Sequence, residues 1–105
     1  MATATLTWTV PTTRTDGSAL TPDMIASIDI FDSAAPDSSV PIGTTKGAQT
    51  TFTTDVLTVG VHNFDVVVND TSGHASAASN IASVTVVATL AAPSAVTDLA
   101  ATLNP

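Results

Sequence analysis

The sequence predicts an all-β protein, specifically a two-sheet antiparallel β-sandwich. Short segments of alternating apolar and polar residues recur along the 105-residue chain, turn residues separate them, and no segment has a helical period. All nine acidic residues are Asp and none is Glu, a choice that favours turns over helices. The length suits one domain that buries a core without disulfides, in keeping with the absence of cysteine.

The N-terminal half contains two predicted strands with a long loop between them. Residues 4–10 (ATLTWTV) alternate cleanly, and Pro11 ends this strand. The loop that follows turns at Asp16-Gly17. Residues 25–31 (IASIDIF) form the second strand, and a further loop leads to a short edge-like piece at residues 42–47.

Three more strands are predicted over residues 49–57, 61–69 and 81–90, with a loop of small residues before the last one. Residues 1–90 are therefore expected to form the sandwich domain, and residues 91–105 a strand-like C-terminal extension. The predicted core comprises the large side chains that share inward faces: Trp8, Ile28, Ile30, Phe64, Val66, Val68, Val84 and Val86.

The charge pattern excludes two classes of partner. The net charge is −7 and the only cations are Arg14 and Lys46, so the chain cannot neutralise a run of nucleic-acid phosphates or bind an anionic membrane surface. No basic and apolar leader segment is visible, and the most apolar stretch is too short to span a bilayer. We therefore expect synthesis and folding in a cytoplasm.

No motif predicts catalysis, a cofactor or a metal site, so the protein is expected not to be an enzyme. His62 shares a strand face with Phe64 and is expected to be a half-buried structural residue, whereas His74 lies in a loop. The chain contains neither a G-x-S-x-G elbow nor the acidic spacing of a calcium loop. The loops lack Trp and Tyr anchors; glycan binding through them is left open.

The order of these segments resembles the fibronectin type III, or immunoglobulin-like, fold. A Leu-x-Trp strand, the turn at Asp16-Gly17, the strand IASIDIF and the run LTVGVHNFDVVVNDTSGHASAASN follow one another as in that family. The resemblance covers roughly residues 3–90. It implies that Trp8 lies on strand B, and that Leu57 and Gly60 precede the aromatic Phe64 of strand F.

Two features depart from the family pattern. The family has a Tyr before strand F whose hydroxyl ties down a corner, a bond that Phe64 cannot make, so packing or another donor must hold the corner. In addition, only Met1 and Ala2 precede the stretch that the resemblance covers, so strand A is expected to be missing from its usual place before strand B. The C-terminal segment PSAVTDLAATL instead looks like a strand A placed after strand G.

This arrangement predicts a tail that acts between subunits, as in donor-strand complementation. Its contact residues are expected to be Val96, Leu99, Ala101 and Leu103. The family resemblance suggests a structural virion protein of a tailed bacteriophage: a capsid decoration or appendage that contacts copies of itself, or a major capsid or tail protein, and resides in the virion. The alternative is an extracellular spacer or carbohydrate-associated module of a secreted bacterial enzyme or adhesin.

Overall fold

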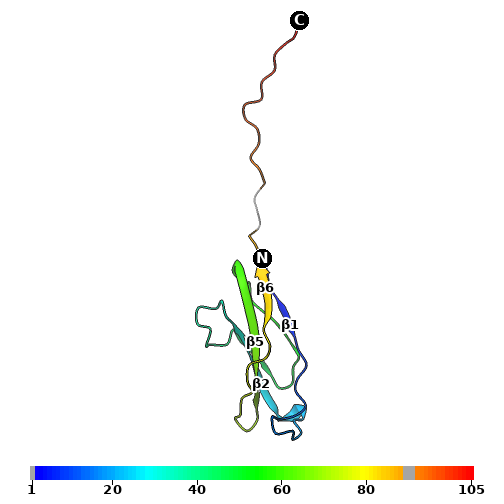
Figure 1. Ribbon diagram of the computed structural model, residues 1–105. Coiled ribbons are helices and arrows are strands. Elements are labelled where there is room, and N and C mark those ends of the chain that lie inside the picture. Colours follow the sequence, from blue (N-terminus) through cyan, green and yellow to red (C-terminus); the bar gives the residue numbers. More distant parts are fainter. Residues whose placement is uncertain (1, 89–91) are drawn as a thin grey trace.

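The computed structural model describes residues 2–88 and 92–105, and these residues form two antiparallel β-sheets (Figure 1). One sheet has two strands in the order β1-β4, and the other has four in the order β3-β2-β5-β6. The part of the chain that is described contains no α-helix, only the 3-10 turn η1 (Pro22–Met24). The strands are β1 (Thr5–Thr7), β2 (Ile25–Asp32), β3 (Gly43–Lys46), β4 (Thr51–Thr53), β5 (Gly60–Asp70) and β6 (Ala82–Val86).

The centre of the protein is the pair formed by the two longest strands, β2 and β5. Ile28 pairs with Val68 and Ile30 with Val66, so these side chains share the inward face of the larger sheet. Ile28, Ile30 and Phe64 are fully buried, as the alternating pattern predicts.

The rest of the predicted core is less enclosed than expected. Trp8, Val66, Val68, Val84 and Val86 are each only half-buried. The small sheet has two strands where the large one has four, so it covers only part of the opposite face. The loop residue Leu20 and the first residue of β2, Ile25, are buried although the pattern did not single them out.

The strands of the small sheet are shorter than the sequence suggests. The strand predicted over residues 4–10 is Thr5–Thr7, and the strand predicted over residues 49–57 is Thr51–Thr53. Isolated backbone bonds continue the pair beyond these limits without extending the regular ladder. The last strand ends at Val86; residues 89 and 90 of that prediction, and residue 91 of the predicted extension, lie outside the described residues.

Side-chain contacts show how the two sheets are stacked. The ring of Phe52 lies so close to Gly43 that an added Cβ would overlap it, so β4 packs directly on β3 at one side of the sandwich. Trp8, just after β1, packs against the buried cluster that includes Ile28 on β2. The small sheet therefore runs across the large one from β3 towards β5, and β1 is its inner strand.

The start of β1 and the end of β6 lie at the same pole of the sandwich. The N–H of Leu57 donates to the carbonyl of Ala2 (2.8 Å), and three residues later Gly60 pairs with Val86. Beyond this pole, residues 92–105 run outward as an extended chain (Figure 1), and the described residues span 93 × 24 × 20 Å.

Candidate functional site

The predicted contact residues of the tail lie outside the sandwich. Val96, Leu99 and Leu103 are 77%, 91% and 92% exposed, and Ala101 is exposed as well. The tail belongs to no strand, and none of the hydrogen bonds found in the described residues involves it. The structure thus leaves this apolar segment free for another molecule; it does not itself bring these residues together with a partner.

At the pole where the tail leaves, a buried histidine links three parts of the chain. His62 on β5 is only 3% exposed, more buried than the half-buried position expected of it. Its Nδ1 lies 2.6 Å from Oδ2 of Asp32, the last residue of β2, and its Nε2 lies 2.7 Å from the carbonyl oxygen of Thr58. The ring of Phe64 stacks on the imidazole, with the two centroids 6.1 Å apart.

The two partners of His62 determine its charge. A neutral imidazole has one N–H donor and one acceptor nitrogen, whereas both groups facing this ring, a carbonyl and a carboxylate, are acceptors. Both bonds form only when the ring carries two protons. The hydrogen bond to Thr58 and the one to Asp32 accordingly raise the pKa of His62 above its ordinary value, against the opposing effect of burial.

The bond from His62 to Thr58 ties the start of β5 to the segment before it. The sequence left packing or another donor as the alternatives for holding this segment; the imidazole Nε2–H is such a donor, and it reaches a backbone carbonyl four residues upstream. Sequence reasoning missed Asp32 as its partner. The signal was present, because Asp32 continues the inward positions Ile28 and Ile30 at a spacing of two residues.

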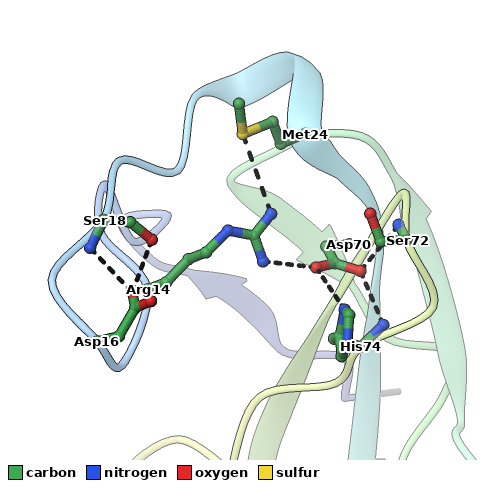
Figure 2. A network of polar contacts seen from close by, with 7 residues as sticks. All are labelled: Arg14, Asp16, Ser18, Met24, Asp70, Ser72 and His74. Carbon is green, nitrogen blue, oxygen red and sulfur yellow. Dashed lines mark hydrogen bonds and ion pairs between the residues drawn. The ribbon is translucent and has the colours of Figure 1, made fainter.

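At the opposite pole, Asp70 joins the two long loops (Figure 2). Its Oδ2 accepts from Nη1 of Arg14 at 2.6 Å, and its Oδ1 accepts the backbone N–H groups of Ser72 and His74 at 2.9 and 2.7 Å. These hydrogen bonds, that of Arg14 foremost, hold the pKa of Asp70 well below its usual value. His74 adds an ion-pair contact at 3.3 Å, but its side chain is 78% exposed.

Each pole has a shallow hollow beside its polar cluster. One of about 290 Å³ lies next to Asp32 and His62, and one of about 280 Å³ lies between Arg14, Leu20 and Asp70. Both fall just below the size range of typical small-molecule sites, roughly 300–1,000 Å³. The charged groups at their centres already bond to one another, His62 to Asp32 and Arg14 to Asp70. Both clusters therefore stabilise the fold by linking strands to loops.

No group of three or more His, Cys, Asp or Glu side chains is arranged to hold a metal ion in the described ranges. Nor does any helix there have the length and hydropathy that a bilayer crossing requires.

Comparison with known proteins gives no relative. No protein-family model, no curated protein and no solved structure matches the chain. Any functional assignment must therefore come from the residues themselves.

Proposed function

We propose that this protein is a non-enzymatic structural component that works through protein–protein contacts, with the C-terminal tail as its contact element. The observation that carries the proposal is the exposure of Val96, Leu99 and Leu103 on an extended segment outside the sandwich. Apolar side chains that share one face of an exposed extended segment, as Leu99, Ala101 and Leu103 do, are typical of a contact surface.

The proposed setting is a tailed-phage virion, where the protein decorates the capsid or forms an appendage. Its partners there are copies of itself or a major capsid or tail protein. The support is the combination of a small cysteine-free β-fold, an acidic and lysine-poor surface, and an apolar tail. A repetitive particle suits such a tail, because many neighbours are held close together and weak contacts act jointly.

The proposed fold family is the fibronectin type III or immunoglobulin-like group. The sheet orders β1-β4 and β3-β2-β5-β6 agree with a family member in which, within the described residues, no strand A pairs with the free edge of β1. The corner bond from His62 to the Thr58 carbonyl supports the same reading, since it does the work of the family's tyrosine hydroxyl.

The energetics of the tail fit a contact made on a scaffold. Burying the two leucines, Leu99 and Leu103, contributes about 1.5–3 kcal/mol for each side chain, from which the entropy cost of ordering the tail must be subtracted. The free energy that remains is too small to hold two molecules together in dilute solution. It is sufficient where neighbours are already held side by side.

The alternative is a spacer or carbohydrate-associated module of a secreted bacterial protein. The extended exposed segment favours it in one respect, because a linker between tandem domains also leaves its domain at a pole. In that case the tail would make no specific contact, and removing it would not affect association.

Deletion of residues 93–105 tests the proposal. We expect the shortened protein to keep its far-UV circular dichroism spectrum and to lose self-association at high concentration and incorporation into particles. A matched control replaces the segment with a Gly/Ser chain of equal length. If the deleted protein associates as well as the full chain, the tail is a linker and the spacer alternative stands.

A further inference from the structure

We infer that the outer edge of β1 receives the tail of a second copy of this chain, which adds a strand to the small sheet antiparallel to β1. The inference rests on the proposed function and specifies its receiving surface. It follows from the backbone groups of β1 that point away from β4, from the half-exposed valines on the inner face of β6, and from the alternation of apolar and polar side chains in the tail.

The backbone of β1 presents unpaired hydrogen-bonding groups at this edge. The N–H of Trp8 donates to the carbonyl of Thr50, and the N–H of Thr54 donates to the carbonyl of Ala4. Backbone groups alternate in direction along an antiparallel strand, so the N–H and C=O of Thr5 and Thr7 point away from β4. Within residues 2–88 and 92–105, β4 is the only strand that pairs with β1.

The large sheet shows which part of the core such a strand would cover. Val84 pairs with His62 and Val86 with Gly60, so both valines face inward with the buried His62. They nevertheless remain half-exposed, whereas the inward residues Ile28 and Ile30 on β2 are fully buried. The inner face of the large sheet is thus less covered at β6, and at Val66 and Val68 on β5, than at β2.

The stacking of the sheets distinguishes the β1 edge from the other open edges. Because β4 packs on β3 through Phe52 and Gly43, the next strand, β1, lies further towards β5. One more strand beyond β1 would lie further along the same direction, over the half-exposed inward residues of β5 and towards Val84 and Val86 on β6. A strand added to the outer edge of β3, by contrast, would meet Lys46, the kind of charged side chain that protects edges from pairing.

The tail has the pattern that this position requires. Leu99, Ala101 and Leu103 alternate with Ala100 and Thr102, so an extended tail buries one face and leaves the other in water. All strand pairs in the structure are antiparallel, and the tail is assigned the same direction.

The occupant is a second copy because of where the tail leaves its own domain. It departs at the pole where β1 begins and runs away from it (Figure 1). To lie antiparallel on its own β1 it would first have to return along the whole sandwich. A neighbouring copy stacked beyond the pole presents its β1 edge to the tail directly. The contact is heterologous, since tail and edge are different surfaces.

Cysteine cross-linking between full-length chains tests the pairing, because the natural chain has no cysteine to interfere. Side chains on the outer face of β1, such as Thr7, would lie beside tail residues that also face outward. We therefore mix Thr7→Cys protein with Ala100→Cys or with Thr102→Cys protein under mild oxidation. The matched control is Ala101→Cys, which points to the opposite face.

The expected result is a mixed disulfide dimer with Ala100→Cys or Thr102→Cys, and about tenfold less with Ala101→Cys, since disulfides form only where the two Cβ atoms face each other. Mass spectrometry of the dimer identifies the linked residues. Equal yields from all three tail positions, or no mixed dimer from any of them, would overturn the inference.

A backbone variant gives an independent readout. Thr7→Pro removes an outward N–H without breaking a bond to β4, and an edge strand tolerates proline in this orientation. We expect Thr7→Pro to keep the melting temperature of the natural chain and to lose self-association, while Thr7→Val keeps both. If Thr7→Pro folds and still associates like the natural chain, the β1 edge is not the receiver.

The two proposals fail in different ways. If deletion of residues 93–105 abolishes association but the cross-links do not form, the tail works as proposed on another surface, and only this inference is wrong. If the deletion has no effect, the proposed function is wrong as well.

Discussion

Replacement of the buried histidine His62 by leucine should be among the most destabilising single changes in this protein. Leucine fills most of the space of the imidazole but donates neither hydrogen bond, so the 4%-exposed carboxylate of Asp32 loses its cationic partner. Removing one partner of a buried ion pair costs about 3–5 kcal/mol. The Thr58 carbonyl loses its donor at the same time.

Urea unfolding at pH 6, followed by far-UV circular dichroism, measures this loss. Two controls isolate the ion pair. His74→Leu removes an exposed histidine and should change the free energy of unfolding by about 0–1 kcal/mol. The double variant with His62→Leu and Asp32→Asn should be more stable than His62→Leu alone, because it removes the unpaired buried charge while the amide oxygen can still accept from the N–H of Ala34.

The pH dependence has a defined sign. Because folding raises the pKa of His62, its contribution is complete below the unfolded pKa of about 6.5 and is lost as the pH rises through the folded pKa. The natural chain should therefore lose stability on the alkaline side of pH 6.5, and His62→Leu should lack this slope. A cost under about 1 kcal/mol for His62→Leu, together with equal slopes in both proteins, would refute the buried imidazolium.

Three further predictions concern packing and the second polar cluster. Gly43→Ala should cost about 1–3 kcal/mol in urea unfolding because its Cβ would overlap the ring of Phe52, and Phe52→Leu should restore part of it. Trp8→Ala should cost about 3 kcal/mol, the low end for a large aromatic, since the ring is half-buried; a value near zero would mean that it is not part of the core. Asp70 has a lowered pKa, so the stability it provides is present above pH ~3.9 and lost on acidification; Asp70→Asn should flatten the acid limb of a pH titration followed by circular dichroism, and an unchanged limb would contradict the pairing with Arg14.

The alternating segments were enough to predict the all-β class and the positions of its two longest strands. The strand expected over residues 25–31 is Ile25–Asp32, and the one expected over residues 61–69 is Gly60–Asp70. Each of these strands has a neighbour on both sides, so the periodic pattern and the hydrogen-bonded ladder have nearly the same limits. The lengths of the two strands in the small sheet were overestimated. Alternation indicates which way side chains face, but it does not indicate how far a partner strand runs alongside.

The polar clusters were harder to foresee from sequence. His62 and Asp32 lie 30 residues apart, and only the register of β2 against β5 brings them together. Arg14 and Asp70 are separated by 56 residues and meet because two loops close over the same pole. Such pairs form only when distant parts of the chain come together in the fold, and no spacing in the local sequence predicts them. The contact role of the tail stays a prediction.

The exit of the tail along the axis of the sandwich has a mechanical consequence. In a row of copies joined through β1, tension would pull each tail parallel to the strand beside it. The hydrogen bonds of an antiparallel pair lie perpendicular to the strands, so all of them would share the load and would have to break together. A strand peeled from one end would instead release its bonds one after another. The joint would therefore resist stretching of the row far better than sideways peeling.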